Sequence, residues 1–154
     1  MTTRVFVPRD SAARSVGADG VAASLAIHAR DRSLDVTIVR NGSRGLLWLE
    51  PLVEVETTEG RIAYGPVAPG DIPSLLDAGF LTGGDHPLRH GPTDEIPWLA
   101  RQQRRMFARV GVIDPLSIAD HRANGGLVAL ERALAMAPAD LVAQVTASGY
   151  SERR

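Results

Sequence analysis

A short alternating segment is the feature that most constrains the fold of this chain. Apolar and acidic residues alternate along Leu52–Glu56, and a period of two is typical of a strand with one face on a core. Residues 58–60 then turn the chain, and Arg61–Tyr64 returns as a hairpin partner. We expect the valines of this hairpin to face a core and its glutamates to face water. Because a lone hairpin is only marginally stable, other elements must cover the apolar face.

The segments around the hairpin supply the rest of an α/β domain. Residues 5–7 indicate a first strand, and 35–40 indicate a second one. Between them, apolar residues at helical spacing predict a helix over 19–30, with Asp19 as a plausible N-cap. A short helix is expected at 71–76. The order β-α-β-β-β-α predicts one sheet covered by two helices, which is a small α/β sandwich.

The pattern changes after residue 80. Glycines and prolines gather in 81–95, which we interpret as a linker between a domain at 1–80 and a helical arm at 96–154. Apolar residues at the start of the arm fall on one helix face. Four arginines fall on the opposite face: Arg101, Arg104, Arg105 and Arg109. The later helices are short, and their leucines need another surface to pack against.

Two residue types are missing, and their absence removes much chemistry. The chain has no cysteine, which excludes disulfides, thiolate zinc sites and all-cysteine iron–sulfur ligation. All 17 basic residues are arginine, so neither a Schiff-base lysine nor a P-loop lysine is present. No glycine-x-serine-x-glycine elbow occurs either. We therefore predict no catalytic residue in this chain.

The charge and hydropathy patterns limit the partners. The net charge is -1, which gives no overall positive field for nucleic acid or an anionic membrane. No apolar run approaches the roughly 18 residues that a membrane span needs. The first residues have the pattern of a strand and not of a secretory leader. We expect a cytoplasmic protein with protein partners.

Asn41–Gly45 and Trp48–Val53 carry a family resemblance. With its surroundings from Val39 to Leu76, this region resembles the thioredoxin-like 2Fe–2S ferredoxin domain of complex I, bidirectional hydrogenases and NAD-dependent formate dehydrogenases. The resemblance implies a thioredoxin-like sandwich. Aligned on Gly45 and Pro51, two of the family's cluster-ligand positions fall on Ser43 and Leu47. With Gly17 as the anchor, the other two fall on Pro8 and Ala13. None of them supplies a thiolate, so the resemblance implies a domain that has lost its cluster.

The second half carries a more specific resemblance. Glu95–Arg105, Phe107–Ser117 and His121–Gly126 look like the lead-in to the FMN- and NADH-binding domain of the flavoprotein subunits in the same enzymes. The front half is most similar to the formate dehydrogenase branch, so the resemblance covers nearly the whole chain. In such enzymes electrons pass from formate, oxidised at molybdenum or tungsten, through iron–sulfur clusters to FMN and NAD. The implied partners are the catalytic subunit and the 2Fe–2S subunit.

The end of the chain departs from that family. In relatives, a segment equivalent to Ala147–Gly149 leads into the glycine-rich loop that holds FMN and the nucleotide, and the 4Fe–4S cysteines follow later. Here Tyr150–Arg154 stands in its place, so FMN, 4Fe–4S and NAD are implied only for a full-length subunit. We expect a docking part of the diaphorase subunit, with Arg154 either a natural end or a truncation. The alternatives are a free-standing thioredoxin-like interaction module and the equivalent segment of an NAD-reducing hydrogenase.

Three weaker signals leave alternatives open. His86 and His90 have the spacing of a zinc pair, but the proline and glycine between and beside them favour a solvated loop. The four arginines of the arm suit an acidic partner surface or a phosphate, or are a solvated helix face. Asn41–Gly45 suits a phosphate-binding turn, although a turn that once shaped a cluster site explains it better.

Overall fold

The computed structural model describes residues 2–149. Met1 and the departure expected at Tyr150–Arg154 lie outside the described residues. The chain divides into two compact units, Met1–Leu116 and Ser117–Arg154, and each is described by itself.

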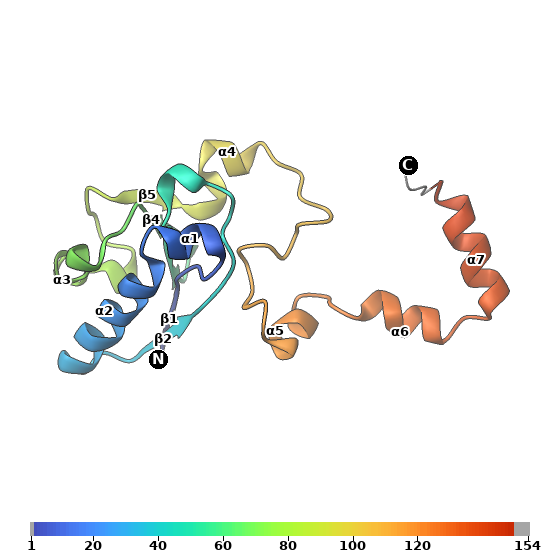
Figure 1. Cartoon of the computed structure of the whole chain (residues 1–154), viewed down its shortest axis with the longest axis horizontal. Helices are drawn as coiled ribbons and strands as arrows, with labels where there is room; N and C mark the ends of the chain where they lie inside the picture. The colour runs from blue at the N-terminus through green and yellow to red at the C-terminus, as the bar shows by residue number, and fades with distance from the viewer. Residues whose placement is uncertain (1, 150–154) are drawn as a thin grey trace. The chain divides into compact units, whose positions relative to one another are not determined.

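The first unit contains one mixed sheet of five strands (Figure 1). The strands follow the order β2-β1-β3-β4-β5 across the sheet. Only β1 and β2 run parallel, and the other neighbours are antiparallel. The bounds are β1 Thr3–Phe6, β2 Val36–Val39, β3 Val53–Thr57, β4 Gly60–Tyr64 and β5 Arg89–Pro92. The parallel pair is joined through helices and the hairpin follows it, as a thioredoxin-like sandwich requires.

Helices and short turns connect the strands of this unit. The helices are α1 Ser11–Ser15, α2 Ala18–Asp31, α3 Ile72–Asp77 and α4 Pro97–Ala100. Single 3-10 turns lie at Leu47–Leu49, Pro69–Asp71, Phe80–Thr82 and Thr93–Glu95. The predicted helices at 19–30 and 71–76 are therefore confirmed, and α1 is an additional turn of helix before the first of them.

One face of the sheet carries the main core. Valines of β1 and β3, with Ile62 and Tyr64 of β4, pack against Leu25 of α2 and Leu75 of α3. Both helices therefore cover the same face, which confirms the predicted α/β sandwich. Each fully buried leucine here contributes about 1.5–3 kcal/mol. The valines of the alternating strand face this core, as predicted.

The second face of the sheet is covered as well, which the alternation did not predict. Cross-strand neighbours Phe6, Glu54 and Ala63 lie in one row on this face. A second apolar cluster extends from Ala63: Leu46, Leu49, Leu52, Ile96 and Leu99. Glu54 is 1% exposed, so the expectation that it faces water is wrong. A glutamate can occupy this position because cationic side chains surround it.

Residues 81–95 do not form the expected linker. They include the edge strand β5, which pairs with β4, and the first unit continues to Leu116. Glycine and proline in this segment suggested flexible chain, but both are tolerated where a strand lies at the edge of a sheet. Gly91 has a φ of +86° and lies where the register of β5 is irregular. The first compact unit therefore includes residues 81–95.

The helix expected after residue 100 is absent from the described structure. Beyond α4, residues 101–117 form turns and irregular chain. The four arginines at 101–109 consequently do not form a helical stripe. Contacts with distant residues hold this segment instead. Arg104 donates to the carbonyl of Arg44, and Arg61 and Asn41 donate to the carbonyls of Gly111 and Val112.

The second unit consists of α5 Ile118–Ala123, α6 Val128–Leu134 and α7 Pro138–Ala147. Gly125 and Gly126 lie between α5 and α6, and Pro138 occupies the first turn of α7. Within the described residues, none of these helices has a buried residue, and Leu134 is 78% exposed. Leu130 and Leu134 of α6 are therefore exposed within this unit. No described helix is long and apolar enough to cross a membrane.

Candidate functional site

The loops that follow β1 and β2 meet at one edge of the sheet, because parallel strands place their carboxyl ends together. These loops carry the four positions that the family resemblance assigns to cluster ligands. Pro8 and Ala13 are buried, Ser43 is half-buried, and Leu47 is 62% exposed. A close network of hydrogen bonds occupies this edge.

Asp10 connects the two loops. Its Oδ1 accepts hydrogen bonds from the backbone N–H groups of Ala12 and Ala13, at 3.0 and 3.2 Å, and so caps α1. Its Oδ2 accepts a bond of 2.5 Å from the backbone N–H of Ser43. One carboxylate thus satisfies three backbone donors from two loops.

Ser43 and Glu50 continue the network toward β3. The Ser43 hydroxyl donates to Oε1 of Glu50 at 2.5 Å and accepts from the N–H of Gly45 at 2.9 Å. Oε2 of Glu50 accepts from the N–H of Leu52 at 2.9 Å. Burial raises the pKa of Glu50, although the hydrogen bonds from Ser43 and Leu52 act to lower it. The loop is therefore held by a buried carboxyl group.

These residues do not fit an iron–sulfur cluster. Cluster iron is held by thiolates, and in some centres by imidazoles. Pro8, Ala13 and Leu47 carry hydrocarbon side chains without a donor atom. The hydroxyl of Ser43 already bonds Glu50 and Gly45. The chemistry of the four side chains, and not merely their spacing, excludes ligation at these positions.

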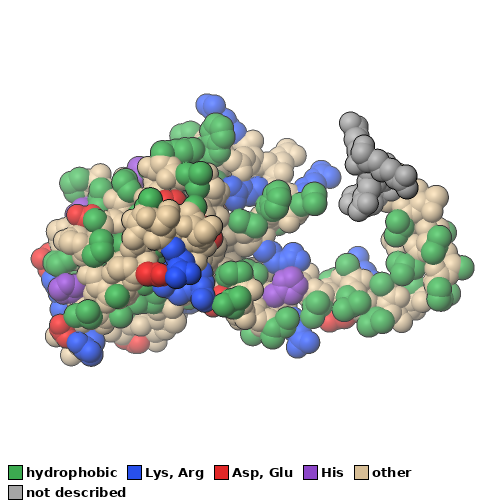
Figure 2. All heavy atoms as spheres, in the orientation of Figure 1, with side chains coloured by type: hydrophobic (Ala, Val, Ile, Leu, Met, Phe, Trp, Pro, Cys, Tyr) green, Lys and Arg blue, Asp and Glu red, His purple; other side chains and the backbone are tan. Residues whose placement is uncertain are grey.

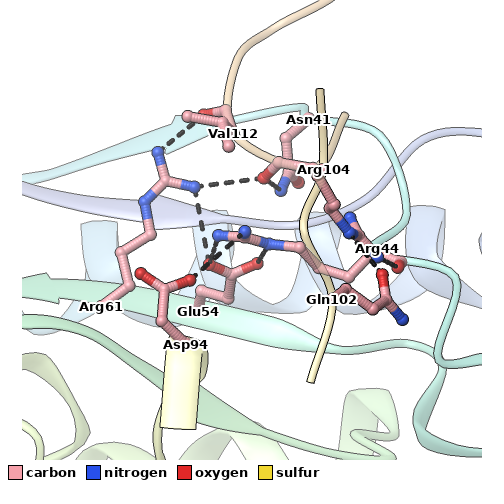
Figure 3. A network of polar contacts seen from close by, with 9 residues as sticks. Asn41, Arg44, Glu54, Arg61, Asp94, Gln102, Arg104 and Val112 are labelled. Atoms are coloured by element: carbon pink, nitrogen blue, oxygen red, sulfur yellow. Dashed lines mark hydrogen bonds and ion pairs between the residues drawn. The ribbon is translucent and has the colours of Figure 1, made fainter. Parts of the chain in front are cut away.

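A buried ion network lies next to the loop (Figure 3). Nε and Nη2 of Arg44 donate to the two carboxylate oxygens of Glu54, at 2.9 and 2.8 Å. Nη1 of Arg61 lies 3.5 Å from Oε2 of the same glutamate. The Arg61 guanidinium also lies 3.3 Å from the centroid of the Phe6 ring. Burial acts to lower the pKa of Arg44, but the hydrogen bonds and charge of Glu54 outweigh it and raise that pKa.

This network fixes the irregular segment after α4. Arg61 donates to the carbonyls of Gly111 and Val112 at 3.2 and 2.6 Å, and Asn41 Nδ2 donates to Gly111 at 2.7 Å. Gly111 has a φ of +80°, and a Cβ at this position would overlap Cδ of Arg44. In the sequence, this ion network corresponds to a glutamate in a strand and arginines at distant positions. That combination is too common in proteins to identify a buried network.

An exposed apolar surface lies beside the loop that follows β2. We call it the aromatic patch, and it consists of Leu47, Trp48, Trp98, Phe107 and Val110. The two tryptophan rings meet edge to face with centroids 5.9 Å apart, and both are more than half exposed. The other three members line one pocket of about 320 Å³. Figure 2 shows apolar side chains gathered over α4.

The four arginines predicted to bind a partner have different environments. Arg104 is half-buried, and its Nη2 donates to the carbonyl of Arg44 at 2.6 Å. Arg109 is half-buried, whereas Arg101 and Arg105 are exposed. The structure therefore brings one of the four, Arg104, into the candidate site.

The two histidines bind different parts of the first unit. His86 Nε2 lies 3.2 Å from Oγ of Ser74, and its Nδ1 accepts from the N–H of Leu88 at 3.2 Å. His90 Nε2 lies 2.8 Å from the carbonyl of Gly65. Among the described residues, no group of three or more His, Asp or Glu side chains could hold a metal ion.

Comparisons with known proteins return matches of fold only. No protein-family model matches the chain, and no curated protein matches it in sequence. Among solved structures, the wild-type thioredoxin-like 2Fe–2S ferredoxin of Aquifex aeolicus is 22% identical, with a TM-score of 0.48, and covers 58% of this chain and 97% of its own. A cysteine-to-serine variant of that ferredoxin is also 22% identical, with a TM-score of 0.49, and covers 58% and 98%.

Proposed function

We propose that this chain is a docking part of the flavoprotein subunit of an NAD-dependent formate dehydrogenase, with no redox group of its own. The observation that carries the proposal is the chemistry of the four aligned ligand positions. None of them carries a thiolate. Hydrogen bonds from Ser43 to Asp10 and Glu50 hold the loop after β2 in place instead. The family resemblance of the sequence supplies the enzyme to which such an element belongs.

The aromatic patch supports a docking role. Exposed tryptophan, phenylalanine and leucine side chains gathered beside one pocket are typical of surfaces that bind other proteins. Tryptophans in such patches commonly contribute most of the binding energy. Trp48 and Trp98 are 60% and 57% exposed, and their edge-to-face contact holds both rings in place.

The enzyme's chemistry belongs to other parts of the assembly in this proposal. Formate oxidation and cluster relay belong to the catalytic and 2Fe–2S subunits, and FMN and NAD to a flavin domain. The exposed leucines of α6 and valines of α7 are further apolar surface without a described partner, and Figure 2 shows apolar side chains over both helices. A docking part of a larger assembly explains such surface better than a self-contained protein does.

The test is co-purification. The full chain is co-expressed with the tagged catalytic and 2Fe–2S subunits of an NAD-dependent formate dehydrogenase, and retention is measured at moderate salt. Trp48→Ser should lower retention about tenfold or more, since tryptophan anchors contribute over 1.4 kcal/mol in many interfaces.

Ile27→Ser is the matched control, because Ile27 is a 48% exposed apolar residue on α2, outside the aromatic patch. It should leave retention unchanged. Failure of the unaltered chain to be retained, with both subunits folded, contradicts the proposal. Retention by the subunits of an NAD-reducing hydrogenase alone would assign the chain to that enzyme instead.

A further inference from the structure

Two adjoining pockets of the first unit share three lining residues: Arg44, Gln102 and Arg104. The first pocket, of about 320 Å³, continues to the apolar side chains of Leu47 and Phe107. The second, of about 400 Å³, continues to Asp94. We call the two together the arginine pocket. Its apolar half and its charged half meet at the two arginines.

The two guanidinium groups retain donors that the protein does not use. Arg44 is 9% exposed, and Glu54 takes its Nε and Nη2. The acid nearest its Nη1 is Asp94, at 3.8 Å and with a side chain that is 94% exposed. Arg104 uses Nε for Gln102 and Nη2 for the Arg44 carbonyl. Within residues 2–149, its Nη1 has no assigned acceptor.

Two carboxylates share the arginine pocket with the guanidinium groups. Asp10 and Asp94 line it together with Arg44 and Arg104. Both oxygens of Asp10 already accept hydrogen bonds from backbone N–H groups. Asp94 is a poor partner for Arg44, because its side chain is exposed and water screens its charge. Burial and the neighbouring charge of Arg44 both lower the pKa of Arg104, while Asp94 acts in the other direction. A carboxylate ligand would take the place of Asp94 beside the two guanidinium groups.

We propose that the arginine pocket binds a carboxylate group that is attached to an apolar body. A carboxylate matches the planar donors of a guanidinium and would compete with the exposed Asp94 for them. The apolar body would lie against Leu47 and Phe107 in the first pocket. The carboxylate can belong to a free organic acid or to an acidic side chain of a partner. This inference does not depend on the proposed enzyme.

The first experiment compares an acid with its neutral isostere. Phenylacetate and phenylacetamide are titrated into the isotopically labelled full chain, and binding is followed by NMR. Phenylacetate should shift the signals of residues 44–47 and 102–107 saturably and bind about tenfold more tightly than phenylacetamide, because charge-assisted bonds are the stronger ones. Equal binding of both compounds, or binding of neither, overturns the proposal.

Variants test whether Arg104 binds the ligand or has a structural role alone. Arg104→Gln should weaken phenylacetate about tenfold, with Arg104→Lys restoring part of the loss. Asp94→Asn removes the competing carboxylate and should strengthen binding about threefold. Arg30→Gln, an exposed position on α2, is the control and should change nothing. Unchanged or weaker binding in Asp94→Asn overturns the proposal, and circular dichroism verifies folding throughout.

A further titration distinguishes the two sources of the carboxylate. The capped tripeptide acetyl-Phe-Glu-Leu-amide places an acidic side chain between two apolar ones. Tighter binding of this peptide than of phenylacetate, lost in Arg104→Gln, supports an acidic side chain of a partner. Tighter binding of phenylacetate supports a free organic acid. Both results agree with a carboxylate as the bound group. The outcome of the co-purification experiment does not depend on which of them is obtained.

Discussion

The Oδ2 atom of Asp10 accepts a hydrogen bond of 2.5 Å from the backbone N–H of Ser43, which joins the loop after β1 to the loop after β2. The same carboxylate caps α1 through its other oxygen. A single side chain therefore holds together the edge of the sheet at which the family resemblance places a cluster.

Asp10→Ala should lower the free energy of unfolding by about 2–4 kcal/mol. The estimate combines the loss of an N-cap with the loss of a charge-assisted hydrogen bond to Ser43. Urea unfolding followed by circular dichroism measures it. Asp31→Ala, at an exposed position near the end of α2, is the control and should cost less than about 0.5 kcal/mol. Equal losses in both variants would contradict the role given to Asp10.

Glu54→Gln should be among the most destabilising conservative changes in the chain. It leaves the guanidinium groups of Arg44 and Arg61 without a counterion in a buried site, at a cost of about 3–5 kcal/mol. Chemical unfolding of the purified variant measures the loss. Glu56→Gln is the matched control on the same strand, because its partner Arg4 lies 3.7 Å away at the surface. That variant should lose less than about 1 kcal/mol.

The pKa of Glu50 predicts how stability depends on pH. Burial raises that pKa above its ordinary value of 4.5, so the folded chain binds this proton more tightly than the unfolded chain. The resulting stability is full below pH 4.5 and is lost as the pH rises through the higher folded-state pKa. In that window the Glu50 carboxyl should make the free energy of unfolding fall by at most about 1.4 kcal/mol per pH unit, and Glu50→Gln should remove this dependence. Unfolding is measured at a series of pH values.

Glu59→Gln, at an exposed turn, is the control for Glu50 and should leave the slope unchanged. Asp19 does not interfere in this window. Its pKa is lowered by hydrogen bonds from Arg40 and Arg14, so its effect falls below the ordinary value of 3.8. A slope that persists in Glu50→Gln would show that another group causes it.

Gly111→Ala should displace Arg44 from Glu54. A Cβ at residue 111 would overlap the Arg44 side chain, and φ at this residue is +80°. We expect a loss of about 2–5 kcal/mol, from left-handed strain and overpacking together. Gly45→Ala is the matched control, because Gly45 has a φ of +85° and nothing within 4 Å of the added atom. Its loss should be limited to the strain, about 1–2 kcal/mol. Thermal and urea unfolding compare the two.

Iron reconstitution tests the expectation that this chain holds no iron–sulfur cluster. The full chain is incubated anaerobically with ferrous iron, sulfide and a thiol reductant, then desalted. We expect a colourless protein with little bound iron, because none of the four aligned side chains is a thiolate. A cysteine-ligated ferredoxin treated in parallel is the positive control. Stoichiometric iron and sulfide in this chain would falsify the account of the ligand loop.

Local sequence patterns determined much of the first unit. Alternation predicted the hairpin and the inward valines of β3, and helical spacing predicted α2. These signals are local, because burial of one face repeats along a few consecutive residues. The absence of cysteine likewise followed from the sequence alone, since no fold can supply a missing thiolate.

Only the tertiary structure decided the rest. It placed Glu54 inside, because Arg44 and Arg61 neutralise it there. It held residues 101–117 in an irregular path, in which Arg61 and Asn41 bind the carbonyls of Gly111 and Val112. It made 89–92 a strand, because β4 offered an unpaired edge. In each case the partner that decides the structure is distant in sequence. A local pattern shows which residues are apolar, but it does not show which charged side chains or strand edges will be in contact.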